Sequence, residues 1–183
     1  RSSATPPAAR TATTMPTPDF PGNSFGQGKN VPAIAMAHGI PYVATATVAD
    51  LHDLERKVRY AMSFHGARYI HILVPCPLGW GAPSAKTIEL ARLAHETGLF
   101  PVFEAEYGEV TNVSKIRRKQ PVEKYLMLQK RFAHLFGKKG NPEIVQRMQA
   151  LADRNIARYG LLGDEQGDDI PVPEQAEERH HVI

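Results

Sequence analysis

The one cysteine of the sequence, Cys76, lies in an unusual stretch, Pro-Cys-Pro-Leu-Gly-Trp-Gly. The prolines on both sides of Cys76 remove backbone donors and restrict φ, which predicts a rigid, non-helical turn that displays the thiol. Gly79 and Gly81 allow another backbone or a cofactor to approach closely. Trp80 is large enough to shield such a site from water. The stretch is therefore a candidate site for sulfur chemistry.

A lone cysteine has two interpretations, and the residues leave both open. Free cysteine is often a small buried hydrophobic residue. Alternatively, Cys76 is a metal ligand. Its partners must then lie elsewhere, because an internal disulfide or a self-sufficient zinc or iron–sulfur site needs several ligands. The histidines show no convincing metal-ligand spacing, and His71 is expected to be a core residue within an apolar strand.

Other polar residues carry weaker signals. Arg1-Ser2-Ser3-Ala4-Thr5-Pro6 is rich in hydroxyls and has one cation, as loops that contact phosphate often do. The sequence has no Gly-x-Ser-x-Gly, P-loop or dinucleotide-binding motif. Glu104, Glu106 and Glu109 are expected to be surface carboxylates.

Strand and helix patterns alternate after residue 30, and they must position these residues. This βαβαβ order predicts an α/β fold with a parallel sheet, in which functional residues gather beyond the carboxyl ends of the strands. Strands are expected over residues 41–46, 69–74 and 99–105, and a first helix over 31–38. A second helix should follow a Thr47-x-x-Asp50 capping box, with an inward face made of Leu51, Leu54, Val58 and Met62. A third should follow Ser84, with an inward face made of Ile88, Ala91 and Ala94. Cys76 follows the second strand.

The rest of the chain is predicted to be helical. Tyr125, Leu128, Phe132 and Leu135 form one apolar stripe, and Asn141-Pro142 begins a last helix that ends at Gly160. We expect an extended arm over residues 1–30, an α/β domain over 31–140, and a C-terminal helix with an acidic tail over 141–183.

The net charge of +3 in 183 residues conceals an uneven distribution. Between Lys115 and Lys139 lie nine Lys and Arg residues and a single acid, Glu123, whereas seven acids follow Gly163. One alternative is therefore a non-catalytic α/β module whose basic face binds nucleic acid or an acidic protein. The longest uncharged windows contain proline, glycine and histidine, so no membrane span is predicted.

Several blocks of the sequence, taken together and in order, point to a family. They are Arg1-Ser2-Ser3-Ala4-Thr5-Pro6, His38-Gly39-Ile40-Pro41-Tyr42-Val43-Ala44-Thr45-Ala46, His71-Ile72-Leu73-Val74-Pro75-Cys76-Pro77-Leu78-Gly79-Trp80, Lys86-Thr87-Ile88-Glu89-Leu90-Ala91, Glu96-Thr97-Gly98, Pro121-Val122-Glu123-Lys124-Tyr125-Leu126 and Gln129-Lys130-Arg131-Phe132. Over about residues 1–136 the chain resembles the β subunit of 2-oxoacid:ferredoxin oxidoreductases, the pyruvate-type members in particular.

The resemblance implies the C-terminal half of a thiamine diphosphate-binding domain. Such β subunits bind thiamine diphosphate with Mg²⁺ and carry one [4Fe–4S] cluster, whose fourth cysteine matches Cys76. Ser2, Ser3 and Thr5 would line the cofactor-binding loop. The family's Gly-Asp-Gly motif and its other three cluster cysteines precede the part that is matched here, so we expect this chain alone to be inactive.

The resemblance also implies a function and its partners. The complex would decarboxylate a 2-oxoacid oxidatively to an acyl-CoA, with pyruvate, a related acid or an aryl glyoxylate as substrate. Electrons would pass through the cluster to ferredoxin or NAD⁺. The expected partners are the other subunits of the complex, ferredoxin or a NAD-linked subunit, and coenzyme A, with no nucleic acid or membrane and a cytoplasmic location.

Overall fold

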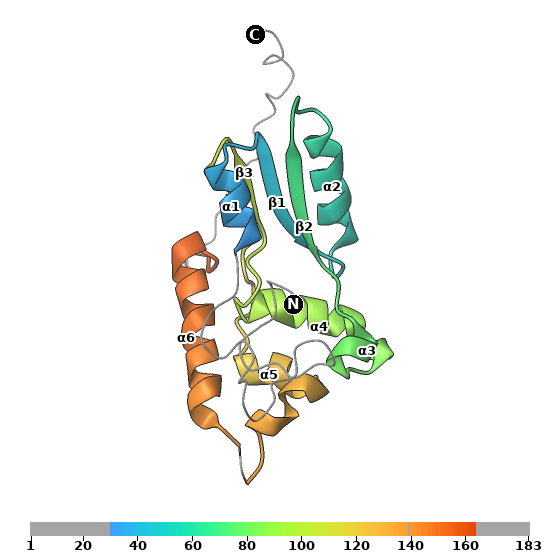
Figure 1. Cartoon of the computed structure of the whole chain (residues 1–183), viewed down its shortest axis with the longest axis vertical. Coiled ribbons are helices and arrows are strands. Elements are labelled where there is room, and N and C mark those ends of the chain that lie inside the picture. Colours follow the sequence, from blue (N-terminus) through green and yellow to red (C-terminus); the bar gives the residue numbers. More distant parts are fainter. Residues whose placement is uncertain (1–29, 139, 164–183) are drawn as a thin grey trace, which may run out of the picture.

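The computed structural model describes residues 30–138 and 140–163, which combine a mixed four-stranded sheet with helices (Figure 1). The strands are ordered β2-β1-β3-β4. Their bounds are Tyr42–Thr47 for β1, Arg68–Leu73 for β2, Phe103–Glu106 for β3 and Glu109–Val113 for β4. The predicted α/β class is confirmed. The expected arm before residue 30 and the acidic tail after residue 163 lie outside the described residues.

Two helices cover opposite faces of the sheet because successive residues of a strand point to opposite sides. Val43 of β1 packs with Ala35 of α1 (Val31–Ala37). Tyr42 and Ala44, its neighbours on either side, pack with Ala61 of α2 (Leu51–Ala61). Every residue of β1 is buried, as the uncharged sequence predicts.

Helix α2 buries a different side from the one expected. Its N-cap is Asp50, which accepts a hydrogen bond from the amide of Asp53 at 2.9 Å, so the predicted capping role of Thr47, the last residue of β1, is wrong. Lys57 is buried, and its ammonium group donates to the carbonyl of Thr45 at 2.9 Å and to Asp53 at 2.6 Å. The predicted inward residues Leu51, Val58 and Met62 are exposed. A charged side chain is buried here because its stem is apolar and its ammonium group is bonded to a carbonyl oxygen and to a carboxylate of opposite charge.

The third strand runs antiparallel to β1, so the prediction of an all-parallel sheet is wrong. Helix α4 (Thr87–Glu96), which follows a short 3-10 turn η1 (Ser84–Lys86), lies across the end of the sheet and not along its face (Figure 1). The chain therefore re-enters the sheet from the end at which β2 left it. Parallel pairing would need a helix that carries the chain back to the start.

Strand β4, which the sequence analysis missed, completes a hairpin with β3. The two-residue turn consists of Tyr107 and Gly108, whose φ angles of 49° and 93° are both positive. Positive φ at both central residues is the geometry of the tight turns that match the twist of a hairpin. The Tyr-Gly pair between two alternating stretches was the available signal.

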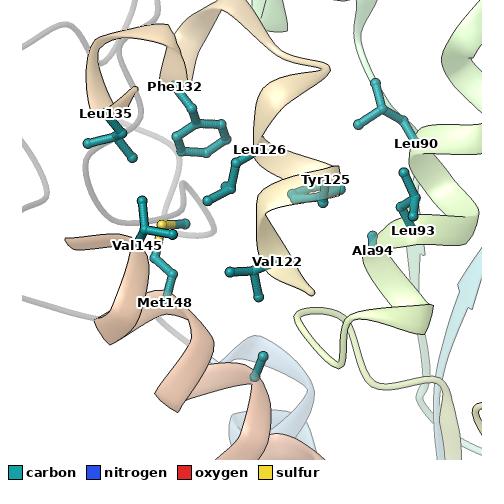
Figure 2. Close-up of a cluster of buried hydrophobic side chains, with 11 residues drawn as sticks. Leu90, Leu93, Ala94, Val122, Tyr125, Leu126, Phe132, Leu135, Val145 and Met148 are labelled. Carbon is teal, nitrogen blue, oxygen red and sulfur yellow. The ribbon is translucent and has the colours of Figure 1, made fainter. Parts of the chain in front are cut away.

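Beyond the sheet, helices α4, α5 (Val122–Met127) and α6 (Pro142–Tyr159) and the 3-10 segment η2 (Lys130–Leu135) enclose a second core (Figure 2). Its buried residues are Leu90, Leu93, Ala94, Val122, Tyr125, Leu126, Phe132, Leu135, Val145, Met148 and Ala152. Asn141 caps α6 and Gly160 ends it, as predicted. The apolar stripe from Tyr125 to Leu135 belongs to α5 and η2 instead of one helix, and Ile88 is exposed although Ala91 and Ala94 are buried.

Gly98 provides a test of how closely α4 and α6 approach. Its φ is +79°, and a Cβ there would lie 2.6 Å from Ile156 Cγ1 and 2.9 Å from the Ala152 carbonyl oxygen. We expect Gly98→Ala to lower the free energy of unfolding by at least about 3 kcal/mol, because it combines backbone strain with a clash. Urea denaturation of the purified protein measures this.

The matched control is Gly39→Ala. Gly39 has a φ of +66°, but a Cβ there would meet nothing within 4 Å. This change should cost only about 1 kcal/mol from the backbone conformation. Equal losses for the two variants would show that the contact with α6 is not tight.

Candidate functional site

Cys76 lies just beyond the carboxyl end of β2, where the chain leaves the sheet. Pro75 is buried, whereas Cys76 is exposed, so the interpretation of Cys76 as a buried hydrophobic residue is wrong. The predicted non-helical turn is also wrong, because Cys76 is the N-cap of a short helix, α3 (Pro77–Trp80). Proline is well tolerated at the first helical position, since its amide would have no partner there. The Cys76 Sγ accepts a hydrogen bond from the amide of Gly79 at 3.3 Å.

The end of α3 is fastened to η2. Gly81 ends the helix with a φ of +64°, and its carbonyl accepts a hydrogen bond from the amide of Lys130 at 3.2 Å. A Cβ on Gly81 would lie 2.7 Å from the Cβ of Lys130. Glycine is needed here both for the left-handed conformation and for the close approach.

Trp80 completes the attachment of α3 to η2. The guanidinium carbon of Arg131 lies 3.9 Å from the centre of a Trp80 ring, which is the geometry of a cation–π contact. Trp80 is half-buried, so part of its surface is covered. Its expected role of shielding Cys76 from water remains a prediction.

Arg131 is a residue that the sequence analysis did not single out for chemistry. It is only 5% exposed, its Nε donates to Gln129 Oε1 at 2.7 Å, and a terminal nitrogen lies 3.4 Å from the Tyr125 hydroxyl. Burial lowers the pKa of Arg131, although Tyr125 and Cys76 favour its charged form. The sequence signal that could have pointed to Arg131 is its position directly before the apolar Phe132.

Glu104 forms a second buried charged cluster, on the opposite side of β1 from α1. It is 3% exposed, which contradicts its prediction as a surface carboxylate. It accepts hydrogen bonds from the Tyr42 hydroxyl at 2.6 Å, from Arg56 at 2.7 Å and from Asn112 at 2.8 Å. Burial by itself raises the pKa of Glu104, but the hydrogen bonds from Arg56, Tyr42 and Asn112 outweigh it, so the pKa lies below its ordinary value.

The other candidate residues do not gather around Cys76 as a metal site. Within residues 30–138 and 140–163, no group of three or more His, Cys, Asp or Glu side chains is arranged to hold a metal ion. His71 is half-buried in β2 beside the Tyr69 hydroxyl at 3.1 Å, and burial lowers the pKa of its imidazole. Ser2, Ser3 and Thr5 lie outside the described residues. Cys76 is therefore one donor without a complete ligand set in the described part of the chain.

The basic run contributes to internal contacts as well as to the surface. Arg131 is buried, Lys119 pairs with Asp153 at 2.8 Å, and Lys115 donates to the Gly160 carbonyl at 2.7 Å. The latter two contacts tie the segment after β4 to α6 and its C-cap. Part of the run thus serves the fold, which leaves fewer charges for a docking face.

Comparison with known proteins finds several relatives of this chain. No family model matches the chain. The chain is 48% identical over 161 residues to a pyruvate synthase subunit PorB of Methanosarcina barkeri. The aligned region covers 88% of the chain and 54% of that PorB subunit. The chain is 37% identical to the PorB subunit of Pyrococcus furiosus over 198 residues, covering 96% and 56% respectively. A ketoisovalerate oxidoreductase subunit VorB of Pyrococcus abyssi is 42% identical over 121 residues, covering 65% and 38%.

Over most of its own length, the chain is therefore similar to PorB subunits, and over about two thirds of it to a VorB subunit. The resemblance to the β subunits of 2-oxoacid:ferredoxin oxidoreductases is thereby confirmed. The chain spans about half the length of the curated relatives that it matches. Among the described residues, no helix combines the length and the apolar character needed to cross a membrane.

The buried carboxylate predicts a pH-dependent contribution to stability. Since the folded-state pKa of Glu104 is depressed, its stabilising effect is present above the ordinary value of 4.5 and is lost as the pH falls through the lower, folded-state pKa. We expect Glu104→Gln to lower the free energy of unfolding at pH 7 by about 1–3 kcal/mol. The gap from the unmodified protein should narrow below pH 4.5.

Denaturant unfolding at a series of pH values measures this gap. Glu109→Gln is the control, because Glu109 is an exposed residue of the same hairpin. A gap that stays constant down to the acid limit would contradict the assigned role of the Glu104 charge.

Proposed function

We propose that this chain is part of a 2-oxoacid oxidoreductase complex in which Cys76 supplies one thiolate ligand of a [4Fe–4S] cluster. One observation carries the proposal: a single exposed thiol stands on a braced turn at the carboxyl end of a strand, in a chain similar to PorB and VorB subunits. The substrate is a 2-oxoacid, with pyruvate and ketoisovalerate named for the relatives.

The residues present fit one corner of such a cluster. Cysteine thiolates are the usual ligands of four-iron clusters, and four are needed. The described part of the chain offers one thiol and no group of potential ligands around it, so the other ligands come from outside this part. Cys76 is exposed, and an approaching metal centre would not have to displace packed side chains to reach its Sγ.

The chain's own residues would orient that ligand. Pro75 and Pro77 restrict the backbone on both sides of Cys76, and the Lys130 amide holds the end of α3 through Gly81. The Gly79 amide already donates to the sulfur, as amides around metal-bound thiolates do when they tune the site.

The remaining roles in the proposed complex rest on the family resemblance. Thiamine diphosphate with Mg²⁺ supplies the chemistry that releases carbon dioxide from a 2-oxoacid, and the cluster takes up single electrons. Ser2, Ser3 and Thr5 would contact thiamine diphosphate. Coenzyme A would receive the acyl group, and ferredoxin or a NAD-linked subunit would receive the electrons.

Replacement of Cys76 tests the proposal. In the full complex purified without oxygen, we expect Cys76→Ala to remove one four-iron cluster from the iron content and its signal from the EPR spectrum of the reduced protein. The reason is that a cluster which loses one of its four thiolates is destabilised. Ser84→Ala, an exposed hydroxyl in the segment that follows α3, is the control and should leave both readouts unchanged. A full complement of clusters in Cys76→Ala would refute the assignment.

A further inference from the structure

We propose that Arg131 is a positioning residue for Cys76, which holds the short helix α3 in place and keeps a buried positive charge on Trp80, the last residue of the helix that Cys76 caps. The inference rests on the proposed function, because it takes Cys76 to be a cluster ligand. It assigns a role to a side chain that lies 55 positions further along the sequence, in a different structural element.

The first part of the argument is mechanical. Helix α3 has only four residues, too few to keep a fixed orientation by its own hydrogen bonds. Three contacts with η2 hold it: the stack of Arg131 on Trp80 at 3.9 Å, the Lys130 amide bond to the Gly81 carbonyl at 3.2 Å, and the packing of Gly81 against Lys130. The stack is the one contact that depends on a charged side chain.

The second part concerns the charge of Arg131. Its partners among the described residues are all neutral: Gln129, the Tyr125 hydroxyl, and the rings of Trp80 and Phe132. Among the described residues, no carboxylate forms an ion pair with Arg131, although only 5% of Arg131 is exposed. Every other buried charge in that part of the chain has an opposite partner, since Lys57 is bonded to Asp53 and Glu104 to Arg56.

An unpaired buried cation is costly unless something else compensates it. The Tyr125 hydroxyl beside Arg131 does not supply a compensating negative charge, because burial raises the pKa of this phenol. Trp80 links Arg131 to Cys76, because its ring lies 3.9 Å from the Arg131 guanidinium carbon and its amide donates a hydrogen bond to the Cys76 carbonyl at 2.9 Å. A metal-bound thiolate would supply the negative charge that the described residues do not.

This arrangement has a consequence for electron transfer. One-electron reduction adds a unit of negative charge to the metal–thiolate centre, and a nearby cation in a poorly solvated site stabilises the reduced form. Removal of the Arg131 charge should therefore make reduction less favourable. Loss of the stack of Arg131 on Trp80, with the charge of Arg131 retained, should change the orientation of the Cys76 ligand more than it changes the reduction potential of the cluster.

The test is a redox titration monitored by EPR on the full complex. We expect Arg131→Met to lower the equilibrium constant for reduction of the cluster by roughly tenfold, a shift toward more negative midpoint potential. Arg131→Lys, which keeps the charge but not the planar stack, should restore most of that shift. Lys138→Met is the control, since it removes an exposed cation of the same basic run that is not among the contacts holding α3, and it should leave the potential unchanged.

A second variant covers the case in which Arg131→Met does not assemble. Trp80→Leu keeps the charge and removes its aromatic partner, and we expect it to alter the line shape of the EPR signal with a smaller shift in potential than Arg131→Met. Potentials and line shapes equal to those of Lys138→Met in every variant would overturn the inference.

The inference and the proposed function fail in different ways. If Cys76→Ala keeps its full set of clusters, the proposed function is wrong and this inference falls with it. If Cys76→Ala loses a cluster while Arg131→Met titrates like the unmodified complex, only the role of Arg131 is wrong.

Discussion

The placement of α4 across the end of the sheet is the constraint on which the rest of the structure depends. Leu90, Leu93 and Ala94 of α4 share a core with residues of α5, η2 and α6, and Leu73 at the end of β2 packs against that core (Figure 2). The chain consequently re-enters the sheet at the end where it left, and β3 runs antiparallel to β1. The same arrangement brings α5 and η2 to the carboxyl end of β2, where they support the turn that carries Cys76.

Buried charges distinguish the structural part of the molecule from the candidate site. Lys57 and Glu104 hold the sheet to α2 and β4, and each has an oppositely charged partner. In such a pair, the opposite charge offsets the free-energy cost of removing each ion from water, and no group outside the fold is needed. Within the described part of the chain Arg131 has neutral partners only, and it stacks on Trp80 of the helix that Cys76 caps. The contrast points to a charge that is balanced when the site is complete.

Elements bounded by strong local signals could be predicted from the sequence. Asn141-Pro142 and Gly160 bound α6 because an Asn cap, a proline at the first position and a left-handed glycine act within a few residues. The strand β1 was likewise clear from its uncharged, β-branched composition. Strand direction and the buried side of α2 were not, because both depend on neighbours far along the chain. Leu51, Val58 and Met62 have the spacing of a buried stripe, yet Lys57 takes the inner position.

The candidate site shows the same division. The sequence by itself determined that one cysteine stands between two prolines and that ordered motifs resemble those of 2-oxoacid:ferredoxin oxidoreductase β subunits, since both are properties of residue order. Only the tertiary structure decided that the thiol is exposed at the N-cap of a short helix, and that Arg131 and Trp80 brace it. The physical reason is that solvent exposure and the balance of a buried charge are set by contacts between residues far apart in the sequence, and such contacts exist only in the folded chain.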